Sequence, residues 1–234
     1  MSFHKIGIIG LGLMGGSILK GLEGKKEIIV ENDLLERLDE VDALILAVPI
    51  SAILEIGEKI GKLQLTRPLI VFDIGSVKEE IASRFEEWSK GKVEFVATHP
   101  MAGKEQSGFA FSDANLFKGA PWIITPHKKN TEVTLLAVEE IIELLGALSQ
   151  RMDAKSHDKK AALVSHLPHI ISKTLLQFVT EEDSQSLEMA GPGFKSMTRL
   201  SRDNPILHAE IGIYNKKNIK TALKKFIAIL EQVE

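Results

Sequence analysis

The start of the chain carries a glycine-rich turn between an apolar, strand-like run and a helical pattern. Gly10, Gly12 and Gly15 form the spacing Gly-x-Gly-x-x-Gly at this point. The first glycine lets the chain turn sharply, the second lets a pyrophosphate approach the backbone, and the third lets the helix pack on the strand. The amino end of that helix offers N–H groups and a partial positive charge to phosphates. This context predicts a dinucleotide-binding turn that includes Leu13 and Met14.

The composition limits what else the chain can be. Its 234 residues suit one large domain or two small ones, and 44% hydrophobic residues are enough for a buried core. A net charge of −3 with mixed signs does not indicate a nucleic-acid partner. No apolar run reaches the roughly 18 residues of a membrane span, and no secretion signal precedes the first strand, so we expect a cytoplasmic protein. Cysteine is absent, which excludes disulfides and thiolate catalysis.

Short apolar runs alternate with helical patterns up to about residue 150. Strands are expected at 5–9, 27–32, 43–48, 69–73, 95–98 and 122–125, and helices at about 51–62, 77–90 and 131–146. This alternation predicts a mostly parallel sheet with helices on both faces, which is typical of a Rossmann-like domain.

From residue 153 onward the periodicity is helical, and no strand is expected. The pattern predicts a long helix over 155–180 that Pro168 kinks or interrupts, a break at 191–193, a helix from Pro205 and a final amphipathic helix over 215–233. We therefore expect an α/β fold in two domains. A dinucleotide-binding domain would cover residues 1–153, and an all-helical domain would cover residues 154–234.

The segment after the second expected strand is unusually short. The acidic residue that binds the ribose hydroxyls usually follows the glycines by about 20 residues, and Asp33 fits that spacing, with Glu31 as the alternative. Residues 33–42 are close to the minimum of about 10–12 residues for a parallel crossover. We therefore expect the first domain to be shortened after residue 33. An acidic Asp33 would repel a 2′-phosphate, which favours NAD over NADP.

Three polar segments follow strands, at the sheet edge where such domains carry their functional groups. Ala47, Val48 and Pro49 would lie against the cofactor, and the sequence Gly-Ser-Val-Lys occupies residues 75–78. His99 begins the sequence His-Pro-Met-Ala-Gly. An imidazole can accept a proton near neutral pH, as the oxidation of an alcohol requires. The alternative is that His99 caps a strand end by bonding a backbone carbonyl.

The helical part adds two histidines and an arginine. His166 and His169 are three residues apart and share one face if they are helical. We expect them to line a substrate cleft and expect no metal, since further ligands at suitable spacing are not evident. Arg199 would either grip a carboxylate or form a surface salt bridge. His157 and Asp158 are expected either as a surface pair or as groups that orient a helix start.

Taken together, the chain resembles prephenate dehydrogenases over nearly its whole length. The matching segments, in the family's order, are residues 10–17, 75–78, 99–103 with Glu105 and Gly108, 116–119, 165–169 and 198–199. The histidine segments are the specific part, because many dehydrogenases share the glycine turn. The resemblance implies an oxidoreductase of tyrosine biosynthesis that uses NAD to convert prephenate into 4-hydroxyphenylpyruvate by oxidative decarboxylation.

The resemblance also implies roles for individual residues. His99 would accept the proton of the ring hydroxyl while a hydride leaves for the nicotinamide. Ser76 would help to orient the hydroxyl and the nicotinamide. Carbon dioxide would then leave, and formation of the aromatic ring would drive the step.

Substrate binding is implied for residues of both domains. Arg199 would grip a carboxylate, His169 with His166 beside it would contact the pyruvyl end, and Glu105 would lie at the mouth of the site. Because the family dimerises through its helical domain, we expect residues 155–234 to carry a homodimer interface.

Two positions depart from the family pattern, and three alternatives remain. Ser196 stands where the family often has aspartate, and His208 where it often has tryptophan.

Arogenate dehydrogenases share the scaffold, although histidines near the substrate's side chain favour the keto acid. A β-hydroxyacid dehydrogenase would rely on a catalytic lysine on a helix. A non-catalytic, ligand-binding paralogue is suggested by the short segment after Asp33. The intact His99, Ser76 and Arg199 segments oppose it.

Overall fold

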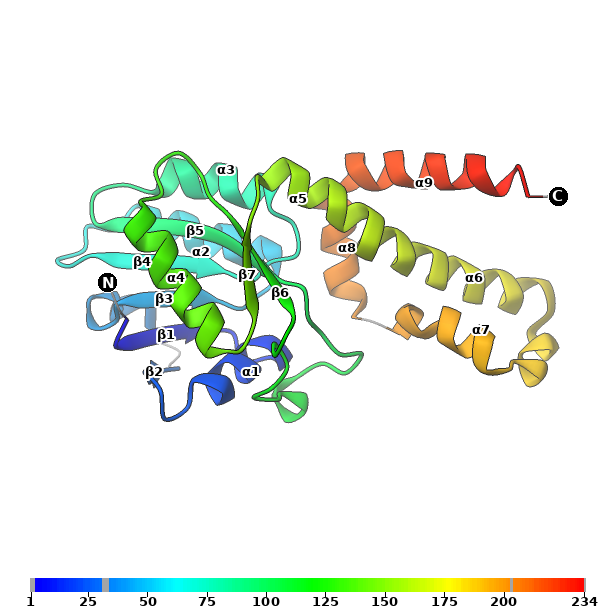
Figure 1. The fold of residues 1–234 in the computed structure, drawn as a ribbon, viewed down its shortest axis with the longest axis horizontal. Coiled ribbons are helices and arrows are strands. Elements are labelled where there is room, and N and C mark those ends of the chain that lie inside the picture. The colour runs from blue at the N-terminus through cyan, green and yellow to red at the C-terminus, as the bar shows by residue number, and fades with distance from the viewer. Residues whose placement is uncertain (1–2, 31–33, 203, 234) are drawn as a thin grey trace. The chain divides into compact units, whose positions relative to one another are not determined.

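The structure is a computed structural model that describes residues 3–30, 34–202 and 204–233. The chain divides into two compact units, Met1–His157 and Asp158–Glu234, which run from blue to green and from yellow to red in Figure 1. The first is an α/β unit, and the described part of the second is helical, so the predicted fold class is confirmed. We keep the domain division between residues 153 and 154 as a proposal, because helix α5 (Ala154–Ala161) begins there.

Seven strands form one sheet in the order β2-β1-β3-β4-β5-β6-β7. Their bounds are β1 (Lys5–Ile9), β2 (Glu27–Ile29), β3 (Ala43–Leu46), β4 (Leu69–Asp73), β5 (Val93–Pro100), β6 (Pro121–Thr125) and β7 (Leu148–Arg151). Every neighbouring pair is parallel except β5 and β6. The carboxyl ends of β1, β3, β4 and β5 therefore lie at one edge of the sheet.

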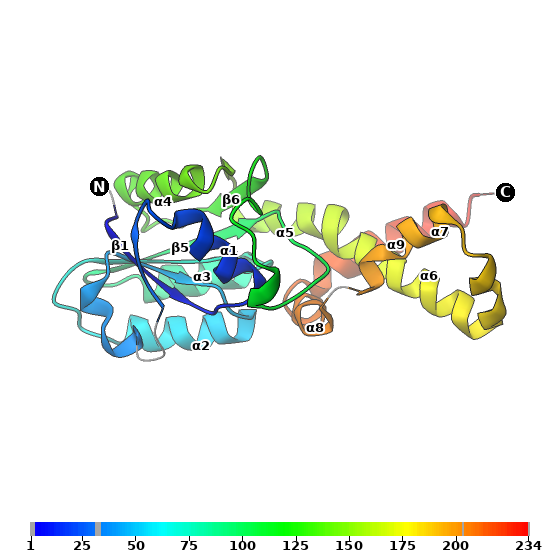
Figure 2. The ribbon, with the colours of Figure 1, turned by 90° about the horizontal axis from the view of Figure 1, so that it is seen from below.

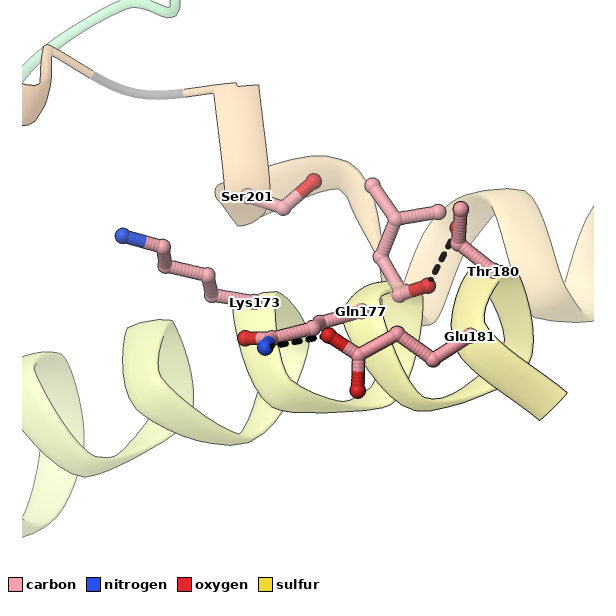
Figure 3. A pocket seen from close by; sticks show the side chains of 6 residues that line it. Lys173, Gln177, Thr180, Glu181 and Ser201 are labelled. Carbon is pink, nitrogen blue, oxygen red and sulfur yellow. Dashed lines mark hydrogen bonds between the residues drawn. The ribbon is translucent and has the colours of Figure 1, made fainter.

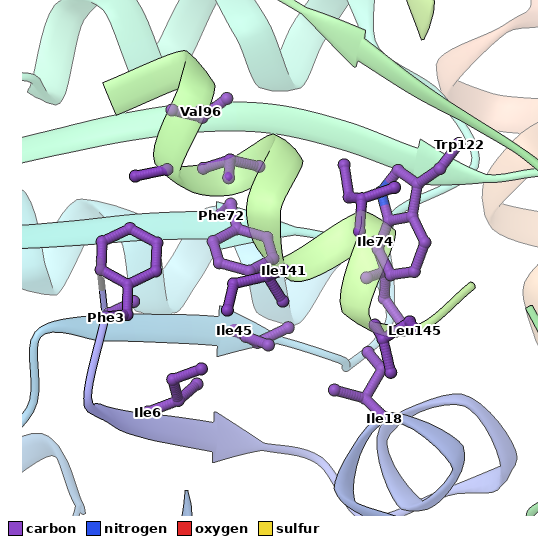
Figure 4. Close-up of a cluster of buried hydrophobic side chains, with 14 of the residues drawn as sticks. Phe3, Ile6, Ile18, Ile45, Phe72, Ile74, Val96, Trp122, Ile141 and Leu145 are labelled. Atoms are coloured by element: carbon purple, nitrogen blue, oxygen red, sulfur yellow. The ribbon is translucent and has the colours of Figure 1, made fainter. Parts of the chain in front are cut away.

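Four helices cover the two faces of this sheet. They are α1 (Leu13–Leu22), α2 (Ile50–Gly61), α3 (Glu79–Trp88) and α4 (Glu132–Leu144). Apolar side chains of α1 and α4 join those of the strands in one buried cluster, part of which Figure 4 shows around Phe72, Trp122 and Ile141. The helices α4 and α2 lie on opposite faces (Figure 2). Burial on both faces explains why the central strands are continuous apolar runs.

The crossover from β2 to β3 is short, and its described part contains two 3₁₀ turns, Leu34–Glu36 and Leu38–Glu40. The described residues between β2 and β3 contain no α-helix and no further strand. Asp42 closes the crossover, because its carboxylate accepts the backbone N–H groups of His4 and Lys5 at 2.8 and 3.0 Å. Both proposed ribose ligands, Asp33 and Glu31, lie outside the described residues.

Strand β7 is not predicted by the sequence pattern. Its residues are Leu-Ser-Gln-Arg, and three of the four are exposed. A polar edge strand lacks the buried apolar alternation that signals a strand, so only its parallel pairing with β6 defines it.

The second unit continues from α5 through a π-helical turn (Ala162–His166) into α6 (Leu167–Asp183). Its other helices are α7 (Pro192–Met197), α8 (Pro205–Tyr214) and α9 (Lys216–Leu230). The π turn lies just before Leu167 and Pro168. Proline has no backbone N–H to donate, and its ring clashes with the preceding turn of a regular α-helix, so the helix is irregular at this point. The expected break at 191–193 is also the start of α7. Among the described helices none is long and apolar enough to cross a membrane.

Candidate active site

The glycine turn has the backbone geometry that its spacing predicts. Gly10 has a φ of +99°, which is the left-handed region that favours glycine, and a Cβ there would clash with the carbonyl oxygen of Ala47. A Cβ at Gly15 would clash with the carbonyl oxygen of Gly10. Around Gly12, in contrast, no atom lies within 4 Å of an added Cβ. The turn is therefore closely packed behind Gly10 and Gly15 and open at Gly12.

The residues around this open point fit the pyrophosphate of a dinucleotide. Gly12 is the N-cap of α1 and offers no side chain to the first-turn N–H groups, and Leu13 and Met14 are half-buried in that turn. Anions bind readily at such a helix end. Residues 47–49 follow β3 and lie against the turn, since Val48 contacts the position of the Gly10 Cβ.

A buried ion pair fixes the segment that follows β4. The carboxylate of Asp73 pairs with the ammonium of Lys78, and both side chains are fully buried. The same carboxylate accepts the N–H groups of Gly75 at 2.7 Å and Thr98 at 2.9 Å. Burial raises the pKa of Asp73, while Lys78 and the two N–H groups oppose this shift. Ser76 is half-buried inside this bonded loop.

The ion pair also joins this loop to β5. Lys78 donates to the carbonyl oxygen of Thr98 at 2.6 Å, and the indole N–H of Trp122 donates to the Thr98 hydroxyl at 2.9 Å. The strand end that carries His99 is therefore held from two sides.

His99 lies near the carboxyl end of β5, opposite Ile123 of β6. The residue is 8% exposed, and its Nδ1 lies 2.9 Å from Nε2 of His157, a residue that is 2% exposed. The two ring planes meet at 70°. The expectation that His157 forms a surface pair is wrong, because both His157 and Asp158 are buried. No local pattern could reveal a contact between residues so far apart in sequence.

The irregular segment between β5 and β6 packs on α1. The backbone N–H of Asp113 donates to the Ser17 hydroxyl at 2.9 Å, and Lys20 donates to the carbonyl oxygen of Ser112 at 2.9 Å. Glu105 is half-buried in this segment. The segment that follows His99 is thereby tied to the helix that follows the glycine turn.

In the helical unit, His166 and His169 are buried. Nδ1 of His166 lies 3.1 Å from the side-chain amide of Asn215, which also donates to the carbonyl oxygen of Asp158 at 2.8 Å. Asn215 thus fixes His166 at the end of the π turn.

His169 stacks on His208, with ring centroids 3.2 Å apart and planes at 5°. Burial lowers the pKa of His208 to about 4, and the nearby His169, His166 and Lys173 add to this shift. His208 is therefore a flat, neutral stacking partner of His169 above about pH 5.

Arg199 is exposed and begins a 3₁₀ turn, Arg199–Arg202. Ser196 is exposed on α7. Beside the turn lies an open pocket of about 400 Å³ (Figure 3), lined by Ser201 and by the α6 residues Lys173, Leu176, Gln177, Thr180 and Glu181. None of these lining residues belongs to a motif of the sequence. The described residues contain no cluster of three or more histidines and acidic residues that could hold a metal ion.

The predicted site residues therefore fall into two groups. In the first unit, the glycine turn, residues 47–49, Ser76 and His99 follow neighbouring strands at one sheet edge. In the second unit, His166 and His169 are buried around Asn215 and His208, and Arg199 lies on the exposed turn. The roles assigned to all these residues stay predictions.

Two family models together match nearly the whole chain. Residues 6–151 match the nucleotide-binding domain of prephenate dehydrogenase. Residues 153–234 match the dimerization domain of the same family.

Individual relatives agree with the family models. A prephenate dehydrogenase of Lactococcus lactis is 32% identical over 260 aligned positions, which cover 98% of this chain and 70% of the relative. Aquifex aeolicus prephenate dehydrogenase, solved with hydroxyphenyl propionate and NAD⁺, has a TM-score of 0.88 at 29% identity over 99% of this chain and 89% of that one. Synechocystis arogenate dehydrogenase has a TM-score of 0.81 at 27% identity, covering 97% and 90%.

Proposed function

The chain belongs to the prephenate dehydrogenase family, and on that premise we propose that it catalyses the NAD-dependent oxidative decarboxylation of prephenate to 4-hydroxyphenylpyruvate in tyrosine biosynthesis. The observation that carries this proposal is the buried His99, held at the carboxyl end of β5 on the sheet that bears the glycine turn. A buried imidazole at that edge suits proton transfer during oxidation of a hydroxyl.

The cofactor would be held by the glycine turn and by residues 47–49. Gly12 leaves open space for a pyrophosphate, and the N–H groups of the first turn of α1, at Leu13 and Met14, would bind it. Bound NAD supplies the acceptor for the hydride that leaves the substrate. The A. aeolicus relative was solved with NAD⁺, which supports this cofactor. A contact between Asp33 and the ribose stays a prediction.

His99 would act as the general base. Its Nε2 would accept the proton of the ring hydroxyl as that carbon is oxidised, and Ser76 would orient the hydroxyl. Loss of the ring carboxylate as carbon dioxide then completes an aromatic ring, and His99 returns the proton to the phenol oxygen. Proton transfer of this kind typically contributes about 10²–10⁴-fold to the rate.

The helical unit would supply the carboxylate contacts. We propose that Arg199 binds one substrate carboxylate, and that His169 with His166 contacts the pyruvyl end. Glu105 of the first unit would lie at the mouth of the site. Arogenate is the second candidate substrate, because the Synechocystis relative is an arogenate dehydrogenase.

We also propose a homodimer, formed through residues 155–234, in the cytoplasm. The match to a dimerization domain supports the homodimer. So does the exposure of large apolar side chains, each more than half exposed: Leu163, Val164, Phe178, Met189, Met197, Ile206, Ile213 and Ile229. So many large apolar side chains exposed on one unit are what an interaction surface would require. Sedimentation would show a species of twice the 25.8 kDa chain mass.

The test is NADH or NADPH formation by the purified protein. Prephenate and arogenate would each be supplied with NAD and with NADP. We expect the fastest turnover with prephenate and NAD. Faster turnover with arogenate would reassign the substrate, and absence of turnover in all four mixtures from a folded dimer would favour a ligand-binding paralogue.

A further inference from the structure

We propose that His157 is a positioning residue that fixes the protonation pattern of His99. The inference rests on the proposed role of His99 as a base. It is carried by one contact, in which Nδ1 of His99 lies 2.9 Å from Nε2 of His157 with both rings buried.

The contact restricts where the protons can be. In a hydrogen bond between two neutral imidazoles, one nitrogen carries the hydrogen and the other accepts it. If His99 accepted at Nδ1, its own proton would be on Nε2, and Nε2 could not act as a base. If His99 donates from Nδ1, its Nε2 is unprotonated and has a lone pair that can accept a proton. Acceptance by His157 therefore selects the form of His99 that can take up a proton.

The same contact serves the protonated state. Once Nε2 of His99 has accepted a proton, the ring is a cation, and its Nδ1–H bond to His157 becomes a stronger, charge-assisted one. The His157 imidazole occupies here the place that a carboxylate holds in a serine–histidine–aspartate triad.

Both rings are held by regular structure rather than by loops. His157 lies in the first turn of α5, and its backbone N–H donates to the carbonyl oxygen of Asp153 at 3.0 Å. The Asp153 carboxylate caps the same turn through the N–H of Ser156 at 2.9 Å. His99 is fixed on β5 by its pairing with β6. Such support is what a precisely placed catalytic group needs.

A matched pair of amide variants tests the inference. In His157→Gln the amide lies at the distance of Nε2, so its oxygen can still accept the Nδ1–H of His99. In His157→Asn the amide reaches only as far as the former Nδ1. With prephenate and NAD, we expect kcat to fall about 100-fold in the asparagine variant and by less than about tenfold in the glutamine variant, as loss of supporting contacts to a catalytic group typically gives. The KM for NAD and the Tm should match in the two variants.

Equal kcat values for the two variants, at any level, would overturn the inference. A second measurement is independent of both variants and of turnover. Among the seven histidines, the ¹⁵N signals of His99 can be assigned by their loss in His99→Asn. We expect Nδ1 to be protonated and Nε2 bare in the wild-type protein at neutral pH, and a proton on Nε2 would contradict the inference. Absence of wild-type turnover would instead refute the proposed function.

Discussion

The two units differ in how completely each buries its own apolar residues. The largest fully buried side chains, among them Trp122, Phe72 and Phe85, all belong to the sheet unit. In the helical unit the buried apolar residues of the described chain are Ala161, Ala162, Leu167, Ile211, Ile219 and Ala222. Its aromatic Phe178 is 58% exposed. The sheet unit thus has a core of its own, whereas the helical unit leaves many large apolar side chains exposed.

The units also differ in how their buried polar groups are satisfied. In the sheet unit, the Asp73 carboxylate has an ammonium and two backbone N–H groups as partners. In the helical unit, the Ser172 hydroxyl is buried and has no hydrogen-bond partner in the described part of the chain. Burying a polar group without a partner costs stability. The comparison predicts that stability depends most on the sheet unit and that substrate contacts depend on the helical one.

The largest expected effect is on the stability of the sheet unit. Lys78→Met leaves the buried Asp73 carboxylate without its cation, and breaking such a pair costs about 3–5 kcal/mol. Denaturant unfolding measures the loss. Lys59→Met, which breaks an exposed pair with Glu55, is the control and should cost less than about 1 kcal/mol. Similar losses in the two variants would contradict the account of the sheet unit.

The next effect is on turnover. His99→Asn removes the proposed base, so kcat should fall about 100-fold or more. Because His99 is not part of the glycine turn, NAD affinity, measured by calorimetry, should not change. A nearly wild-type kcat in this variant would show that His99 is not the base. The proposed role of the sheet unit would then be limited to binding the cofactor.

A smaller effect is expected in the helical unit. Arg199→Ala removes a guanidinium proposed to bind a substrate carboxylate, and a hydrogen bond to a charged group is typically worth about 1.5–3 kcal/mol. The KM for prephenate should therefore rise about tenfold or more, with kcat less affected. Arg202→Ala, on the same exposed turn, is the matched control. Equal changes in KM for both variants would make the role of Arg199 structural.

The smallest effect concerns pH. The pKa of His208 is lowered from 6.5 to about 4 in the folded chain by burial and by His169, His166 and Lys173. Between these values the unfolded chain binds the proton and the folded chain does not, so stability falls as pH drops from about 6.5 to about 4. Above about pH 6.5, His208 adds no pH dependence to the stability of the folded chain. In His208→Phe, which keeps a stacking ring, the fall in Tm between about pH 7 and about pH 5 should shrink by up to about 4 °C. An unchanged fall would show that other groups control it.

The sequence predicts the parts of the molecule that rest on local patterns. The glycine turn, the buried strands and the kink at Pro168 each follow from a few neighbouring residues. Strand β7 was missed because an exposed edge strand needs no apolar alternation.

Contacts between distant residues could not be predicted. Three such contacts depend on how separate elements pack. They are the bond between His99 and His157, the stack of His169 on His208 and the hydrogen bond from Lys78 to Thr98. The sequence shows each of these residues, but it does not show which distant residue each of them contacts.

The most direct test of the account is the product balance of the reaction. Prephenate labelled with ¹³C in its ring carboxylate would be mixed with NAD and either the wild-type protein or His99→Asn. For the wild type, we expect equal molar amounts of NADH, labelled carbon dioxide and 4-hydroxyphenylpyruvate, with all three formed at least about 100-fold more slowly by the variant. Absence of NADH from the folded wild-type dimer, or NADH without labelled carbon dioxide, would contradict the account.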